Sequence, residues 1–399
     1  MKTGKLKRWP YLLLGMLLFI FAGVVYAWSL FAEPLEAAHG WTRAETSMVF
    51  TICMVMFNIA NVVGGFLVNK TSIRVNMIIT TVCLLAGFIS SAYVSSVWQL
   101  YLTYGVLIGF GIGLSYSPTI SVIVSWFPDK PGMASGMLLL AFGMSTLVVG
   151  TQVARLFGII GIERTFITIG IVAAAVVLFV SFFMKTPPKD AVFPKPAERK
   201  SNPDVQGEDM PSSQVIRRPS FWLFMLWQTG IVTAGMAVVG QAATAATSIG
   251  ATVALATVAT SGLSVANGVS RFFWGTLCDI LGITKIRMLL SITALVGFGI
   301  SIAGLATSNV VLLIVSFIII GMAYGGSVGH PASFVRTMYG SKYYASNFSL
   351  VFMPGFITAF IGPTIMAAVY SSSGYLPAFC AMGALALVGG VAGLFIKKP

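Results

Sequence analysis

The chain has 399 residues, of which 57% are hydrophobic and 9% are charged, and its net charge is +13. Its mean hydropathy is +0.91. A soluble domain needs a polar surface and is excluded by this composition, so we predict an integral membrane protein within a lipid bilayer. The basic residues form no stripe with interleaved aromatics, so we expect no nucleic-acid partner and assign the positive charge to contact with anionic lipid headgroups.

Apolar runs of about 20 residues are long enough to cross the hydrocarbon layer as helices. The sequence predicts twelve such helices, over residues 11–32, 46–68, 75–95, 98–126, 132–158, 164–184, 219–243, 251–277, 287–306, 309–335, 343–370 and 375–396. The first run follows basic residues, as the apolar part of a signal peptide does. It is long and lacks a convincing cleavage site, so we interpret it as a retained helix.

Lysine and arginine are concentrated in alternate loops between the predicted helices. Basic residues stay on the cytoplasmic side of a membrane, so this pattern predicts that both termini are cytoplasmic and that the protein lies in the plasma (inner) membrane. The predicted cytoplasmic residues are Lys2, Lys5, Lys7, Arg8, Lys70, Arg74, Lys130, the seven from Lys185 to Arg218, Lys285, Arg287, Arg336, Lys342, Lys397 and Lys398, and the predicted outer residues are Arg43, Arg155 and Arg164.

Residues 185–218 interrupt the apolar sequence with six prolines and charges of both signs. We interpret them as a cytoplasmic linker between an N-terminal six-helix bundle over residues 1–184 and a C-terminal one over residues 219–399. The halves align on each other at offsets of 210 to 213 residues. The aligned positions are Gly65 and Asn69 with Gly275 and Asp279, Gly113 and Pro118 with Gly326 and Pro331, and Gly143 and Gly150 with Gly355 and Gly362. The predicted fold class is therefore an all-α membrane protein with two pseudo-symmetric six-helix bundles.

Two loops carry related glycine and acid or amide spacings. Gly275-x-x-x-Asp279-x-x-Gly282, followed by Lys285, recurs in degraded form as Gly65-x-x-x-Asn69-Lys70 with Arg74. This signature resembles the loop motif of the major facilitator superfamily, whose fold has twelve helices in two bundles. The resemblance implies a gating role for these loops, and Asn69 in place of the usual Asp implies a weaker gate in the N-terminal half.

Three further stretches resemble the oxalate:formate antiporter group and the related monocarboxylate transporters. They are Tyr26-Ala27-Trp28-Ser29-Leu30-Phe31 with Pro34-Leu35, Trp126-Phe127-Pro128-Asp129-Lys130 with Ala134-Ser135-Gly136, and Arg271 with Trp274-Gly275. The resemblance covers essentially all twelve predicted helices. It implies secondary active transport of a small carboxylate anion by alternating access.

Arg271 is the one basic residue that the predicted topology places deep in the membrane, about 12 Å along the helix from Asp279 at 1.5 Å per residue. A buried guanidinium is costly and usually lines a water-filled path, and its fork of donors fits a carboxylate. Asn267 and Ser264 continue the same helix face. The alternative is an arginine that binds main-chain carbonyls and has no ligand.

By the resemblance, aromatic and apolar residues at similar depth surround the substrate, although each could also serve packing alone. These residues are Tyr26, Val25, Tyr116, Tyr324 and Phe352. The antiporter group has a lysine as a second cation in the eleventh helix, where alignment puts Gly355. One cation suits one carboxylate, because a second negative charge would lack a partner at low dielectric. We therefore expect a monocarboxylate such as lactate, pyruvate, formate or glycolate.

His330 is the candidate for proton coupling, because no Asp or Glu falls near the midplane and the reference pKa of histidine is about 6.5. The alternatives are a neutral histidine bonded to a neighbouring helix and a proton that travels with the carboxylate at Arg271.

The sequence favours proton-coupled symport of a monocarboxylate, with carboxylate:carboxylate exchange as the same-fold alternative and a non-transporting carboxylate sensor as the alternative of another class. We expect no enzyme, because no nucleophile with a base or metal cluster is evident. The four cysteines lack CxxC or Cys/His spacing, so we also expect no disulfide, metal or cofactor. We expect the protein to function as a monomer.

Overall fold

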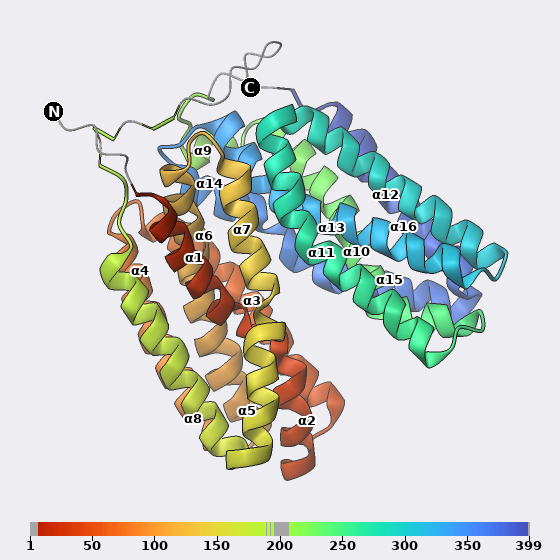
Figure 1. Ribbon diagram of the computed structural model, residues 1–399, viewed down its shortest axis with the longest axis horizontal. Coiled ribbons are helices and arrows are strands. Elements are labelled where there is room, and N and C mark those ends of the chain that lie inside the picture. Colours follow the sequence, from red (N-terminus) through yellow and green to blue (C-terminus); the bar gives the residue numbers. More distant parts are fainter. Residues whose placement is uncertain (1–6, 189, 192, 195–206, 398–399) are drawn as a thin grey trace. The chain divides into compact units, whose positions relative to one another are not determined.

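A computed structural model describes residues 7–188, 190, 191, 193, 194 and 207–397. Predicted cytoplasmic residues Lys2, Lys5, Lys189, Lys195, Arg199, Lys200 and Lys398 lie outside these ranges. Within the described ranges all regular structure is helical (Figure 1).

The helices divide between two compact units. The first unit comprises Met1–Asp129, Met137–Pro196 and Tyr343–Leu350, and the second comprises Lys130–Gly136, Ala197–Lys342 and Val351–Pro399. The early elements are α1 (Trp9–Ala22), η1 (Gly23–Ala27), α2 (Trp28–His39), α3 (Arg43–Leu67), α4 (Ile73–Ala92), α5 (Val97–Leu100), η2 (Tyr101–Ile108), α6 (Gly109–Trp126), α7 (Pro131–Gly143), η3 (Thr146–Gly150) and α8 (Thr151–Phe183). The later elements are α9 (Ser212–Val215), α10 (Pro219–Ser248), α11 (Val253–Leu281), α12 (Ile283–Ala306), α13 (Val310–Tyr339), α14 (Tyr344–Phe352), α15 (Pro354–Ser373) and α16 (Tyr375–Leu394).

Ten helical stretches in the described part of the chain are long and apolar enough to cross a membrane. One of them, Pro131–Phe183, has 53 residues and would measure about 80 Å, far more than a bilayer of about 30 Å. Gly161 divides it, with φ 79° and ψ 177°, so it makes two crossings. The consecutive helices α14 and α15 occupy the predicted run 343–370, so each of the twelve predicted helices has a helical counterpart.

Several predicted helices contain irregular turns that periodicity did not indicate. The first narrows to a 3₁₀ turn at η1, where a Cβ on Gly23 would overlap the carbonyl oxygen of Phe142. In α6, Pro118 cannot donate a hydrogen bond to the carbonyl of Leu114. Asn76 of α4 donates from Nδ2 to that oxygen at 3.0 Å instead. The proline is therefore tolerated within a buried helix.

Glycines bring helix backbones into direct contact, in the same way in both units. In the first unit, a Cβ on Gly109 or Gly113 of α6 would overlap the carbonyl oxygen of Cys53 or Phe57 of α3. In the second unit, Gly321 and Gly325 of α13 lie in the same way against Leu263 and Asn267 of α11. The offset is 212 residues for the glycines and 210 for their partners. The repeat predicted from sequence is thus present in the packing, although the contact pairs Gly113 with Gly325 rather than with Gly326.

One end of the first unit gathers basic and aromatic residues. Arg8 forms an ion pair with Asp129 and lies over the ring of Phe127, 4.7 Å from its centroid. Trp126 donates from Nε1 to the main-chain oxygen of Lys185 at 2.7 Å. The start of the first helix, the α6–α7 loop and the end of α8 therefore share one end, as the predicted topology requires.

Candidate functional site

Arg271 lies on α11 in the second unit and is 6% exposed. Neighbouring turns of α11 are fixed against α13, because Trp274 donates from Nε1 to the main-chain oxygen of Met322 at 3.1 Å and Gly325 contacts the carbonyl of Asn267. The guanidinium donates from Nη2 to Oδ1 of Asn267 at 3.5 Å. The amide oxygen of Asn267 thus orients the cation, and its NH₂ group remains as a donor beside it.

Polar side chains continue from Arg271 along α11. Thr257 and Ser264 are exposed, and Asn267 is partly exposed. Intervals of three, four and seven residues put these positions on one helix face. A single stripe of hydroxyl and amide groups therefore leads to the buried cation.

Tyr324, Phe352 and Gly355 belong to the same unit as Arg271. Tyr324 is 8% exposed and its hydroxyl donates to Sδ of Met236 on α10 at 3.0 Å. Phe352 is the last residue of α14, and Gly355 lies in the first turn of α15. Among the described side chains, a Cβ on Gly355 would meet Cε1 of Phe352, at 4.0 Å, and no other atom within 4 Å.

His330 is 4% exposed and packs in an aromatic pocket of α10 and α13. Its ring centroid lies 5.9 Å from that of Phe224 and 5.2 Å from that of Trp227. Nδ1 is 4.0 Å from Sγ of Cys278 on α11. Nε2 is buried and has no hydrogen-bond partner among the residues that the structure describes.

Tyr26, Val25 and Tyr116 belong to the first unit. Tyr116 is 2% exposed, and its ring centroid lies 5.1 Å from that of Phe57 and 5.4 Å from that of Phe142. Tyr26 lies in η1, is 42% exposed and makes an edge contact with the same Phe142 at 5.2 Å. Val25 is fully buried. Phe142 therefore joins the two tyrosines, one exposed and one buried.

The loop motif of the second unit caps a helix. The carboxylate of Asp279 accepts hydrogen bonds from the main-chain N–H groups of Gly132 and Met133, at 2.8 and 2.7 Å. The negative charge of this carboxylate also interacts favourably with the positive end of the α7 helix dipole. Gly275 permits the approach, because a Cβ there would overlap the carbonyl oxygen of Gly132.

The corresponding loop of the first unit makes a neutral contact. Asn69 donates from Nδ2 to the hydroxyl of Ser346 at 3.1 Å, and a Cβ on Gly65 would lie 2.6 Å from the carbonyl oxygen of Ala345. Arg74 donates to the main-chain oxygen of Ser181 at 3.3 Å. The two motif copies therefore contact corresponding helix starts, with a charged cap in one and an amide in the other.

Sequence reasoning missed one buried cation. Arg287 is only 1% exposed and donates to the main-chain oxygens of Gly393 and Ile396, at 2.9 and 3.4 Å. These carbonyls end α16, where a cation is favourable. Its position at a predicted helix boundary gave no signal of burial, because the acceptors are more than 100 residues away.

Comparison with known proteins identifies the family. A model of the Major Facilitator Superfamily matches residues 12–245 and 226–399. The chain belongs to this superfamily. It is 27% identical over 388 residues to the oxalate:formate antiporter of Oxalobacter formigenes, covering 94% of this chain and 88% of the antiporter.

Other proteins resemble this superfamily member over part of its sequence or in their fold. It is 25% identical to monocarboxylate transporter 1 of Homo sapiens over 156 residues, covering 38% of this chain and 31% of that protein. The solved structure of FucP in the outward conformation has a TM-score of 0.71 at 15% identity, over 98% of this chain and 99% of FucP. The proton:xylose symporter XylE has a TM-score of 0.73 at 13% identity, over 98% of this chain and 96% of XylE. These two likenesses confirm the fold.

Proposed function

We propose that this superfamily member transports small monocarboxylates by alternating access and that Arg271 binds the carboxylate. The observation that carries the proposal is a 6% exposed guanidinium in an apolar membrane helix, at the end of a stripe of hydroxyl and amide groups. A guanidinium can give a carboxylate two parallel hydrogen bonds. The similarity to a carboxylate antiporter supports the same substrate class.

The substrate carries one negative charge. Gly355 has space around it and supplies no cation, so a dianion would bring a second charge to a site with one guanidinium. Tyr324 and Phe352, which belong to the same unit as Arg271, contribute apolar and hydroxyl surface for a short organic acid. By the likeness to carboxylate transporters, Tyr26, Val25 and Tyr116 of the first unit also take part in selecting the substrate.

A proton accompanies the carboxylate, and His330 is its carrier. The imidazole stacks on the ring of Phe224 and makes an edge contact with Trp227, and its buried Nε2, which has no hydrogen-bond partner among the described residues, can accept a proton. The similarity to an antiporter favours a second function, the exchange of one carboxylate for another.

The motif loops act as gates of unequal strength. Asp279 holds the start of α7 through a charged cap, whereas Asn69 offers Ser346 one neutral bond. Charge-assisted hydrogen bonds are about twice as strong as neutral ones. The C-terminal copy is therefore the stronger gate.

The protein acts as a monomer in the inner membrane, with both termini in the cytoplasm.

Uptake into proteoliposomes separates these functions. A panel of labelled mono- and dicarboxylates is offered with an inward proton gradient, or with no gradient and unlabelled carboxylate inside. Symport gives accumulation that follows the proton gradient, and exchange gives uptake that needs internal carboxylate. If no carboxylate is transported under either condition although the purified protein binds one, the transport proposal is wrong and the protein is a sensor.

A further inference from the structure

A cavity of about 260 Å³ lies in the first unit, between α2 and α3. It is at the far end of the 31-residue span that begins at Trp9, next to Arg8, and so faces outward in the proposed topology. Its lining includes one arginine, four hydroxyl groups and an indole ring, which belong to Arg43, Ser29, Thr46, Ser47, Tyr26 and Trp28.

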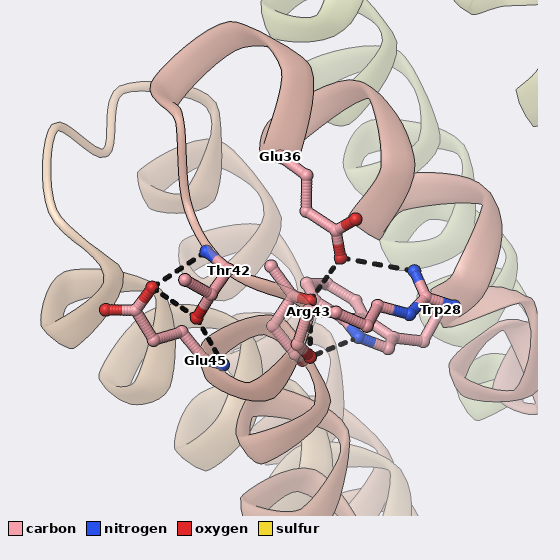
Figure 2. Close-up of polar contacts among 6 residues, drawn as sticks. Trp28, Glu36, Thr42, Arg43 and Glu45 are labelled. Atoms are coloured by element: carbon pink, nitrogen blue, oxygen red, sulfur yellow. Dashed lines mark hydrogen bonds and ion pairs between the residues drawn. The ribbon is translucent and has the colours of Figure 1, made fainter.

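Figure 2 shows how the arginine is held at this cavity. Arg43 donates from Nη1 to Oε1 of Glu36 at 3.1 Å, and the same carboxylate accepts from the hydroxyl of Thr46. Thr42 and Glu45 form a capping box around the first turn of α3. The box fixes the backbone that carries Arg43, so the guanidinium is set at the cavity.

We propose that this cavity is an outer binding site for a small carboxylate, which takes the place of Glu36 on Arg43 before it is transported. The proposal rests on the carboxylate transport proposed above. It assigns Arg43 a role in capturing substrate that neither the sequence nor the comparisons indicated.

The ion pair between Arg43 and Glu36 can open to let another carboxylate bind Arg43. The side chains of Arg43 and Glu36 are 63% and 22% exposed, and such surface pairs contribute little net stability. Glu36 takes one of the five N–H donors of the guanidinium, which leaves an edge of the fork for another carboxylate.

The cavity also fits the rest of a short organic acid. One water occupies about 30 Å³ of liquid, so about 260 Å³ has room for several waters or for an acid of a few heavy atoms. The exposed hydroxyls of Ser29 and Ser47 can bind a hydroxyl or carbonyl of the acid. The ring of Trp28 offers an apolar surface for its carbon chain.

Electrostatics give a reason for a local cation at this face. The proposed outer side carries Glu33, Glu36, Glu45 and Glu163 against Arg43, Arg155 and Arg164. An anion arriving from outside therefore meets no overall attractive field. A cation set in a concave site can raise the local concentration of the anion where the net charge does not.

Protection of a cysteine from labelling tests the site without relying on transport. Ser47→Cys is made with Cys380→Ser, because Cys380 is the exposed native cysteine in the described residues. An uncharged, membrane-impermeant maleimide labels the new thiol, and external lactate should slow labelling at least threefold. Arg43→Gln should abolish this protection. Glu36→Gln should lower the lactate concentration that is needed for protection. The control is Arg155→Gln, which removes an exposed arginine outside the cavity and should leave protection unchanged.

Two further variants separate this inference from the transport proposal. Arg271→Lys should lose transport yet keep lactate protection at position 47, because the outer site does not depend on Arg271. In transport, Arg43→Gln should raise KM about tenfold at unchanged kcat, as expected for the loss of a charged hydrogen-bonding partner, and Arg43→Lys should be intermediate. Normal transport without protection, or equal protection in Arg43→Gln, would overturn the outer site. Protection in a protein that transports no carboxylate would overturn the transport proposal alone.

Discussion

Arg271 offers a carboxylate both a charge and a planar fork of donors, and these can be tested separately. Arg271→Lys keeps the charge but presents a single ammonium that cannot make two parallel hydrogen bonds. We expect transport to fall at least tenfold, measured as initial uptake per inserted protein. The control is Arg155→Lys on the exposed surface of α8. Wild-type uptake by Arg271→Lys would show that Arg271 is not the carboxylate site.

In the proposed site, the absence of a cation at Gly355 limits the substrate to one negative charge. Oxalate should not compete with lactate uptake at equal concentration in the wild type. Because a Cβ at this position meets no described atom closer than 4.0 Å, Gly355→Lys should fold and shift preference toward oxalate by about tenfold, the effect of one added ion pair at a partly buried site. The control Gly355→Met adds a side chain of similar length without a charge, and it should not shift preference toward oxalate. Equal competition by oxalate in the wild type would reveal a second cation.

The proposed role of His330 as the proton carrier can be tested by substitution. His330→Gln keeps a polar group in the aromatic pocket but cannot be protonated. We expect lactate binding to remain and uptake to lose its rise at low external pH, measured as initial uptake at external pH values from about 5.5 to about 8. A full pH response in the variant would mean that the proton travels with the carboxylate at Arg271.

The close packing of helix pairs depends on glycine at the contact. Two glycine-to-alanine substitutions, one at such a contact and one away from it, measure how much stability the contact contributes. A Cβ on Gly113 would overlap main-chain atoms of Phe57, which cannot move without shifting α3. Gly113→Ala should therefore destabilise the protein by about 2 kcal/mol. Gly299→Ala on α12 meets nothing within 4 Å and should be neutral or slightly stabilising. The apparent unfolding temperature in detergent distinguishes them, and equal shifts would show that the backbone contact is dispensable.

The sequence predicts the helices better than their irregular turns. An apolar run of about 20 residues marks a crossing whatever its exact winding, so all twelve were identifiable. The 3₁₀ turn at η1 depends on Phe142 of another helix, and the break before Pro354 separates α14 from α15 within one apolar run. The approach of Gly23 to Phe142 joins residues more than 100 positions apart, so no local pattern indicates it.

Some features of the candidate site could be predicted from residues close together in the sequence, and others depend on residues far apart in the sequence. Arg271 and Asn267 are one turn apart, so their common face could be predicted and their hydrogen bond follows from it. The aromatic surround of His330 comes from α10, roughly 100 residues earlier in the chain, and no local pattern indicates it. The ion pair of Glu36 and Arg43 crosses a turn between two helices and likewise needed the fold.

At the scale of the whole molecule, symport and uncoupled uptake differ in the charge they carry. A monocarboxylate that enters with one proton moves no net charge, whereas the anion alone works against about 2.3 kcal/mol per 100 mV of inside-negative potential. Lactate uptake at a fixed pH gradient should therefore not change when a potassium diffusion potential is imposed with valinomycin. Slower uptake at inside-negative potential would contradict one-to-one symport.

The division into units also has a consequence for synthesis. Lys130–Gly136 cluster with residues that follow 197, and Gly132 and Met133 bind Asp279, which the ribosome adds well over 100 residues later. Tyr343–Leu350, in turn, complete a unit whose other residues were made first. The first six helices therefore leave the translocon with the start of α7 uncapped and with the place of α14 empty. A ribosome that stops in the linker would release a bundle lacking both contacts, and membrane quality-control proteases should degrade it faster than the finished chain.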